Sequence, residues 1–431
     1  MARDGQSYDV VIAGASVAGC AAATLYGRQG LKVALLDRVA SVEDYKKVCT
    51  TFIQASALPT IERLGIRPDL DAVGAVANGA EFWTRWGWIR LVEDAETRMY
   101  PRHGYSLKRS ALDPILRQSA AGTPGVTLRL GMTVDRVIEE GGRVVGLGCT
   151  DPDGGPDGGR EEIRAPLIVA ADGRNSTLAR LIDAKTSSKP NNRFVYYAFF
   201  RNLDLNSGNR SIFWALDPDM AFAYPFPNAE TLLCCFVTRD KLAQWKGRVE
   251  EAFLDFFRAV PEMPDLSKAE RISEFRGMLQ MDNVRRPAVQ KGVALIGDAA
   301  IAADPMSGVG CGWALQSAEW LVDATAAPIA ERTGIEAALA RYARIHKRRL
   351  WQHEHFISDN STGRRMNLLE RMISIAAVSD PKVGNRLHLF TSRHIGVLDF
   401  LSPAMLGRVA RANLLRLAGV GRSAPSAALV R

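Results

Sequence analysis

The chain has 431 residues, of which 47% are hydrophobic and 24% charged, and its formal net charge is +8. This length is enough for two or three domains with a large core, and no apolar run approaches the roughly 18 residues that a transmembrane helix requires. The six cysteines follow no regular spacing, which favours reduced thiols over a disulfide framework or a zinc site. We therefore expect a cytoplasmic protein without a membrane span, a metal site or a nucleic-acid partner.

Residues 8–37 are predicted to form a strand, a tight turn, a helix and a second strand. The apolar run Val10–Ile12 suits a buried parallel strand, and the turn from Gly14 to Gly19 leads into an alanine-rich helix. The second strand ends on Asp37. A first glycine for the turn, a last glycine for helix packing and an acid about 20 residues later match a dinucleotide-binding fingerprint.

The chemistry of this turn suits a diphosphate, which needs bare backbone N–H groups and the positive end of a helix dipole. Ser16 stands where the fingerprint has its middle glycine, and its small side chain can donate a hydrogen bond. Asp37 is expected to bind ribose hydroxyls and to disfavour a 2′-phosphate, so the site should prefer FAD or NAD to NADP. Ala18 and Arg38 complete the predicted binding set of this unit. An ordinary glycine-rich turn is the alternative.

The next part of the chain is predicted to visit a different sheet before it returns to the first domain. The aromatic run 80–91 and the extended run 98–107 are assigned to this second sheet. Trp83, Trp86 and Trp88 are expected to pack in it rather than to form a stacking platform. The other elements predicted here are helices at 55–64 and 109–117, strands at 126–149 with a hairpin turn at Gly141-Gly142, an exposed loop at 151–159 and a strand at 162–171.

Residues 194–239 are predicted to form four strands, which make up the main body of the second sheet. An amphipathic helix at 242–260, an edge strand at 272–278, an apolar strand at 293–296 and a helix beginning at 308–313 follow, and the chain from residue 335 onward is mainly helical. The basic cluster at 341–349 is interpreted as a solvated helix face. Attraction of an anionic cofactor or of an acidic carrier protein is the alternative.

Three predicted strands end on an aspartate at a turn. Asp172 precedes a glycine and Asp298 follows Gly297, which repeats the strand ending at Asp37. Because parallel strands deliver ligand groups at their carboxyl ends, we expect all three to point at one extended cofactor. With these motifs in this order, the sequence resembles the p-hydroxybenzoate hydroxylase-like flavoprotein superfamily over roughly residues 8–345. That superfamily includes aromatic-ring monooxygenases, flavin-dependent halogenases and geranylgeranyl reductases.

The resemblance implies an α/β fold in which a Rossmann-like FAD-binding domain is interleaved with a mainly antiparallel β-sheet substrate domain and followed by a helical C-terminal region. The FAD-binding domain is expected at residues 1–78, 108–190 and 285–345, the substrate domain at 79–107 and 191–284, and the helical region at 346–431.

The resemblance also implies a role for each residue of the predicted FAD site. Gly14, Ser16 and Gly19 would bind the pyrophosphate and Asp37 the ribose, while Arg109 would lie against FAD and the backbone of Val134 would meet the adenine. Asp172 would lie near the flavin and the nicotinamide. Asp298, after Gly297, would accept a hydrogen bond from a ribityl hydroxyl. The loop with Gly308 and Gly310 would lie beneath the isoalloxazine ring. Backbone N–H groups at the start of the following helix would there stabilise the negative charge of reduced flavin.

The activity that the resemblance favours is monooxygenation in specialised metabolism. NAD(P)H would reduce FAD, and a flavin C4a-hydroperoxide would transfer one oxygen atom to an aromatic or polyunsaturated apolar small molecule, free or bound to a carrier protein. A separate flavin reductase is a further expected partner, and the chain would act as a monomer or homodimer. Reduction or dehydrogenation of a lipid-like or polycyclic substrate is the alternative. A halogenase is disfavoured because its tryptophan signature is absent, and a binding protein without turnover would not need the flavin-facing loop.

Few side chains qualify for acid–base chemistry, and no catalytic residue is predicted. His103 is placed in the second sheet, where a structural role is favoured over contact with substrate. His353 and His355 are expected to point to different sides of a helix, and Cys311 to pack rather than to act in redox chemistry. An aromatic sheet face is predicted to keep the site dry; it consists of Phe199, Phe213, Trp214, Phe222, Tyr224 and Phe226.

Overall fold

The computed structural model describes residues 7–151 and 159–419. Its centre is a six-stranded sheet in the order β21-β22-β12-β1-β2-β8, parallel except for β21 at one edge. The strands are β1 (Val10–Ala13), β2 (Val33–Leu36), β8 (Val126–Arg129), β12 (Leu167–Ala170), β21 (Val289–Gln290) and β22 (Val293–Leu295). The inner strands are buried on both faces, which explains why they read as continuous apolar runs.

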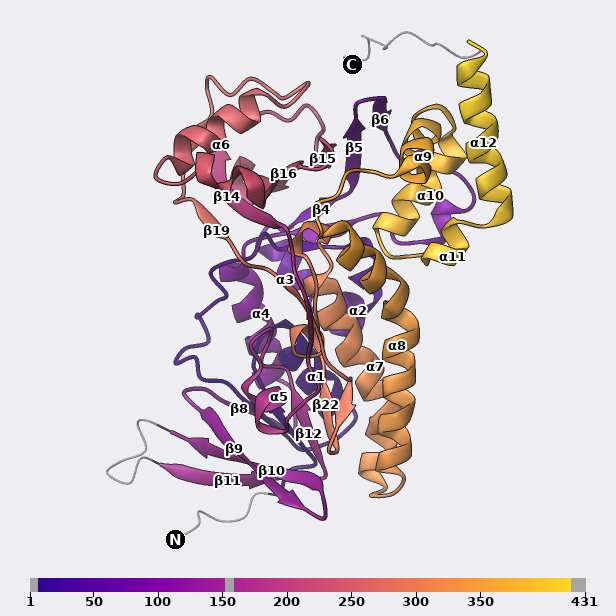
Figure 1. Cartoon of the computed structure of the whole chain (residues 1–431). Coiled ribbons are helices and arrows are strands. Elements are labelled where there is room, and N and C mark those ends of the chain that lie inside the picture. The colour runs from indigo at the N-terminus through magenta and orange to yellow at the C-terminus, as the bar shows by residue number, and fades with distance from the viewer. Residues whose placement is uncertain (1–6, 152–158, 420–431) are drawn as a thin grey trace.

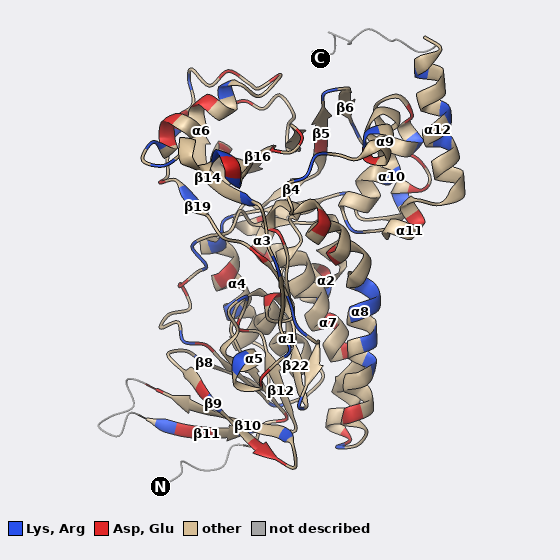
Figure 2. Ribbon diagram, in the orientation of Figure 1, with Lys and Arg blue, Asp and Glu red and all other residues tan. Residues whose placement is uncertain are grey.

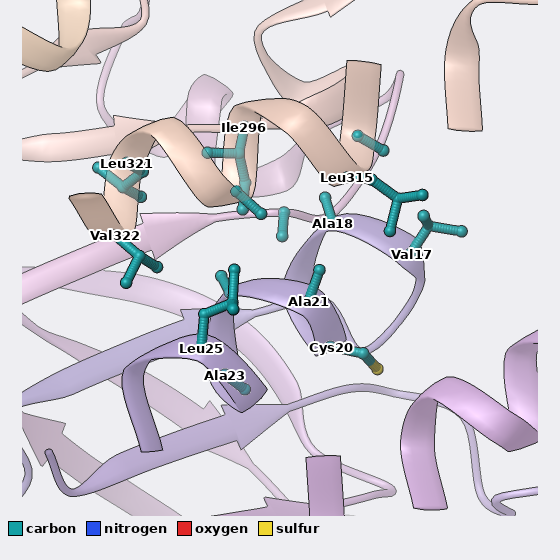
Figure 3. Close-up of a cluster of buried hydrophobic side chains, with 14 of the residues drawn as sticks. Val17, Ala18, Cys20, Ala21, Ala23, Leu25, Ile296, Leu315, Leu321 and Val322 are labelled. Atoms are coloured by element: carbon teal, nitrogen blue, oxygen red, sulfur yellow. The ribbon is translucent and has the colours of Figure 1, made fainter. Parts of the chain in front are cut away.

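Helices cover one face of this sheet. They are α1 (Val17–Arg28), α4 (Arg109–Ala121), α7 (Gly310–Ala330) and α8 (Ile335–Asn360). Small side chains let α1 and α7 approach closely, and Figure 3 shows Ala18 and Ala21 of α1 near Leu315 of α7 and Ile296. Eleven residues of α1, 17–27, are buried, so packing rather than an amphipathic pattern stabilises this helix. The short helices α2 (Leu58–Arg63) and α3 (Arg67–Ala72) contact α7 and α4, respectively.

The other face of the central sheet packs against a three-stranded sheet in the order β11-β10-β9 and against α5 (Thr177–Leu181). The strands are β9 (Thr133–Glu140), β10 (Arg143–Thr150) and β11 (Arg160–Arg164). Gly141 and Gly142 have φ angles of 57° and 78° and form the predicted hairpin turn. The predicted strand 162–171 is divided into β11 and β12, and most of the predicted loop 151–159 lies outside the described residues.

The second large sheet has eight strands and is mainly antiparallel. Its order is β18-β14-β17-β16-β15-β5-β6, with β19 paired to β14. The strands are β5 (Ala80–Thr84), β6 (Gly87–Ile89), β14 (Arg193–Arg201), β15 (Ser211–Ala215), β16 (Met220–Phe226), β17 (Glu230–Thr238), β18 (Glu270–Arg271) and β19 (Arg276–Met278). The four predicted strands of 194–239 are confirmed, and α6 (Val249–Arg258) covers one face. Trp83 and Trp88 pack on that face, and their Nε1 atoms donate to Glu262.

Some predicted elements need correction. The run 98–107 does not join the large sheet: its strand β7 (Gly104–Ser106) pairs with β3 (Phe52–Ile53) and β4 (Val76–Asn78) in a small sheet. His103 therefore lies beside this small sheet, with its ring edge-on to Tyr105. The helix predicted at 242–260 begins only at Val249. A further small sheet consists of β13 (Ser187–Lys189), β20 (Asn283–Arg285) and β23 (Ile301–Ala302).

The C-terminal helices form a separate bundle that packs against the β5–β6 end of the large sheet, as Figure 1 shows. They are α9 (Leu368–Ser379), α10 (Pro381–Thr391), α11 (Val397–Phe400) and α12 (Pro403–Leu417). The long helix α8 connects the central sheet to this bundle, and the Lys and Arg residues of 341–349 lie exposed along it (Figure 2). Among the described helices, none is long and apolar enough to cross a membrane.

Candidate FAD and substrate site

The turn between β1 and α1 has room only for glycine at two positions. Gly14 has a φ of 110°, and a Cβ atom there would lie 2.4 Å from the carbonyl oxygen of Ala171. A Cβ on Gly19 would lie 1.7 Å from the carbonyl oxygen of Gly14. The turn therefore stays tight, and the first amides of α1, which have no partner within the helix, open toward the carboxyl end of the sheet.

Asp37 and Arg109 stabilise this turn from two sides. Asp37 accepts hydrogen bonds from the amides of Ala15 at 2.6 Å and Val39 at 3.1 Å. Arg109 at the start of α4 donates from Nη2 to the Ser16 hydroxyl at 2.7 Å and from Nε to Asp113 at 2.7 Å. The Ser16 side chain thus accepts a bond from Arg109, a contact that the glycine of the usual fingerprint cannot make.

A second group gathers at the end of β22. Gly297 has a φ of 56°, and its Cβ position lies 3.0 Å from the Cβ atom of Ala18 in α1. Asp298 has its Oδ2 atom 3.5 Å from Lys46 Nζ, and the Cβ position of Gly310 lies 3.9 Å from its Oδ1 atom. The predicted residues Ala18, Gly297, Asp298 and Gly310 therefore lie around the N-terminus of α7, together with Lys46, which was not predicted. The first turn of α7 carries no acidic residue that would oppose an anion.

The remaining predicted residues lie around these two groups. Asp172 accepts a bond from Leu178 N at 3.0 Å, and its Oδ1 atom is buried without a hydrogen-bond partner among the described residues. Burial raises the pKa of Asp172. Val134 is half-buried in β9, and Arg38 is exposed in the loop after β2. Gly308 has a φ of 61° and precedes α7.

The chain's own residues fit an extended dinucleotide such as FAD. The turn at Gly14 would hold a diphosphate on the α1 amides, and Asp37 is positioned for a ribose. Asp298 and the N-terminus of α7 would receive the flavin end, and the orphaned oxygen of Asp172 lies at the end of the strand between them. This fit agrees with the predicted roles of these residues, which stay predictions until a complex is observed.

A thiol pair near the flavin end was not predicted from the sequence. The thiol of Cys49 makes a hydrogen bond with that of Cys311 in the first turn of α7, and Arg109 and Lys46 lie close to it. The hydrogen bond and these two cations lower the pKa of Cys49 well below its usual range, while the pKa of Cys311 is raised. The two residues lie in distant segments, so no spacing pattern links them.

A cavity of about 840 Å³ begins at the loop before α7, where Met306, Ser307 and Gly308 line it. Phe82 of β5, Phe213 of β15 and Phe222 of β16 form one wall. The opposite wall comes from the C-terminal region, with Phe356, Ile373, Leu387, His388, Phe390 and Arg393. This second wall was not predicted from the sequence, because a helical pattern does not show which helix face meets the sheet.

The predicted aromatic wall is partly correct: of its six residues, Phe213 and Phe222 line the cavity. Phe199, Phe213, Phe222, Tyr224 and Phe226 share one face of the large sheet. The prediction for Trp214 is wrong. Trp214 follows Phe213 in β15, so its side chain points to the opposite face of the sheet, where it is fully buried with the side chains under α6.

The comparison with protein families decides the assignment. The family described as FAD binding domain matches residues 7–356, which include both halves of the site. The chain belongs to this FAD-binding family. It is an FAD-dependent oxidoreductase of the predicted p-hydroxybenzoate hydroxylase-like superfamily, so the prediction of the superfamily, of its interleaved α/β fold and of FAD is confirmed.

Relatives of this FAD-binding protein include enzymes with different reactions. The digeranylgeranylglycerophospholipid reductase of Thermoplasma acidophilum is 23% identical over 348 residues, which cover 80% of this chain and 84% of the reductase. The flavin-dependent brominase Bmp2 has a TM-score of 0.73 at 18% identity and covers 96% of this chain and 100% of its own. The p-nitrophenol 4-monooxygenase PnpA of Pseudomonas putida has a TM-score of 0.73 at 20% identity, covering 91% and 99%. At these identities the solved structures show a shared fold, not a shared reaction.

Proposed function

We propose that this FAD-dependent oxidoreductase is a monooxygenase that transfers one oxygen atom to an aromatic or polyunsaturated apolar small molecule. The observation that carries this proposal is the apolar cavity of about 840 Å³, which begins at the loop before α7 and is walled by aromatic side chains from the large sheet and the C-terminal helices. Such a cavity holds a planar apolar substrate and excludes water from the reacting atoms.

The chain's own residues mainly bind and orient. The amides at the start of α1 would hold the diphosphate, Asp37 a ribose, and Asp298 with the N-terminus of α7 the flavin end. FAD, when bound, supplies the redox chemistry and the activation of dioxygen. In the balanced reaction, substrate, dioxygen, NAD(P)H and a proton give the oxygenated product, water and NAD(P)⁺. Phe82, Phe213 and Phe222 would keep the substrate dry during the transfer.

Reduction of a lipid-like substrate is the second candidate, and two observations favour it. The reductase of Thermoplasma acidophilum aligns with 80% of this chain. The hydrogen-bonded thiols of Cys49 and Cys311 lie at the N-terminus of α7, where the reduction of a double bond would need a proton donor next to a hydride.

A single-turnover experiment separates the two candidates. The FAD-loaded protein is reduced with one equivalent of dithionite and mixed either with hydroxynaphthoate and dioxygen, or with a digeranylgeranyl phospholipid under argon. Monooxygenation predicts that the flavin is reoxidised only with dioxygen and that the aromatic acid gains the mass of one oxygen atom. Reoxidation by the lipid under argon, with loss of a double bond, would contradict the proposal and support the reductase.

A further inference from the structure

The arginines that line the cavity are already paired with carboxylates, with one exception. Arg193 lies 3.6 Å from Asp304, Arg210 lies 2.7 Å from Glu81, Arg102 lies 2.6 Å from Glu93, and Arg364 lies 2.5 Å from Asp359 and 2.6 Å from Glu370. Arg393, two residues after the end of α10, has no carboxylate within ion-pair distance among the described residues. Arg393 therefore brings to the cavity a guanidinium without a carboxylate partner of its own. The lining also holds the carboxylate of Asp217, which accepts a hydrogen bond from Met366 N.

The contacts of Arg393 leave part of its guanidinium free. Its Nε atom is buried without a hydrogen-bond partner among the described residues. Nη1 lies 3.3 Å from Nδ1 of His353, and the guanidinium lies 5.7 Å from the Phe390 ring centroid. Burial lowers the pKa of His353 to about 3, so this neighbour is neutral and does not balance the charge. Nη2 forms no hydrogen bond with the described residues and remains for a ligand.

The environment of Arg393 is also costly for the free protein. Burial lowers the pKa of its guanidinium to about 10, which reflects the loss of water around a charge without a counter-ion. Its φ of 65° lies in the left-handed region, where glycine is the usual residue after a helix. A residue with both features is a candidate for a functional role.

We propose that Arg393 binds the carboxylate of the substrate, so that the cavity takes a monoanionic apolar acid with an aromatic or polyunsaturated body. This assignment rests on the proposed function, because it names the substrate class for the same cavity. The guanidinium of Arg393 has no carboxylate partner of its own, and its planar N–H groups match the two oxygens of one carboxylate. The aromatic walls would receive the rest of the molecule.

Two ligands of equal shape test the charge of the substrate. Naphthoate and naphthamide differ in one group, and only naphthoate carries a negative charge. Equilibrium dialysis against the oxidised, FAD-loaded protein measures their affinities without reductant or turnover. We expect the wild-type protein to bind naphthoate about ten- to a hundred-fold more tightly than naphthamide, since a charge-assisted hydrogen bond is lost with the amide.

Variants of Arg393 then locate the charge. Arg393→Gly removes the guanidinium and relieves the left-handed backbone, so it should melt no lower than the wild type yet bind both ligands alike. Arg393→Gln keeps the backbone cost and should lose the preference too, which guards against an effect of backbone change. Arg332→Gly is the matched control: Arg332 also follows a helix, has a φ of 53°, is exposed and lies outside the cavity lining. It should keep the preference for naphthoate.

Three results would overturn the assignment: no binding of naphthoate by the wild type, equal wild-type affinities for the two ligands, or an unchanged preference in both Arg393 variants. These results are separable from a failure of the proposed function. A protein that prefers naphthoate through Arg393 but transfers no oxygen would retain the anion site and lose the monooxygenase assignment.

Discussion

Cys49 is the residue whose chemistry the structure changes most. Its thiol meets the thiol of Cys311 and two cations, Arg109 and Lys46, at the site expected for the flavin end. A thiolate is favoured there because the Cys311 thiol donates a hydrogen bond and the cations stabilise negative charge.

Replacing Cys311 with Ala should therefore raise the pKa of Cys49. Alkylation by iodoacetamide requires the thiolate, so the labelling rate of Cys49 rises with pH. In the FAD-free protein, the midpoint of this rise should lie at a higher pH in the variant than in the wild type. Mass spectrometry of the labelled peptide against pH gives the midpoint. Cys149→Ala, in the distant strand β10, is the control and should leave the midpoint unchanged. An unchanged midpoint in Cys311→Ala would show that the two thiols do not interact.

Sequence spacing placed the glycines at the tight turn and the carboxylates at strand ends, while their roles in binding FAD stay predictions. The glycines of the first turn and the carboxylates at strand ends could be found because spacing alone specifies them. The contact of Ser16 with Arg109 and the thiol pair could not, since they join distant segments. The error at Trp214 was avoidable: neighbours in a strand face opposite sides, so Phe213 and Trp214 cannot share one wall.

At the scale of elements, the packing of α1 on the turn after β1 makes a sharp prediction. Gly19→Ala would place a Cβ atom 1.7 Å from the Gly14 carbonyl oxygen, so the turn must open and the diphosphate site be lost. We expect loss of bound FAD and a lower melting temperature. Gly407→Ala in α12 is the matched control, because a Cβ there meets nothing within 4 Å. It should retain FAD and gain about 0.5–1 kcal/mol in the free energy of unfolding from helix propensity. FAD retention by Gly19→Ala would contradict the turn's role.

The C-terminal helices should loosen in acid. Burial lowers the pKa of His388 to about 4 and of His353 to about 3, both below the unfolded value near 6.5. Between the pKa of each histidine in the folded protein and its unfolded value, the unfolded chain therefore binds more protons than the folded protein does. The free energy of unfolding decreases as the pH falls below about 6.5. Each of these buried histidines should cost about 1.4 kcal/mol at pH 5.5.

Thermal unfolding at about pH 7.5 and pH 5.5 measures this loss. His388→Phe should reduce the acid-induced loss, whatever its effect on stability at neutral pH, whereas His355→Phe at an exposed position should not. An equal pH dependence in wild type and His388→Phe would argue against a neutral, buried imidazole.

At the scale of the whole molecule, the fold was predictable and the cavity was not. Apolar strands, a helix-forming turn and the strands of a second sheet predict an α/β protein, and the family resemblance implies that its two domains are interleaved. The cavity arises where the large sheet, the loop before α7 and the C-terminal bundle meet, and this arrangement depends on tertiary packing. Short strands such as β7 were misassigned because three residues carry too little pattern to specify a partner strand.

We propose that the whole molecule delivers one oxygen atom from dioxygen to an apolar substrate in this cavity. The most direct measurement is a turnover under heavy-isotope dioxygen with hydroxynaphthoate, FAD-loaded protein and NADH or NADPH, followed by mass spectrometry of the product. We expect a product with one heavy oxygen atom and a matching uptake of dioxygen. Release of all consumed dioxygen as hydrogen peroxide, or a product oxygen derived from water, would contradict it.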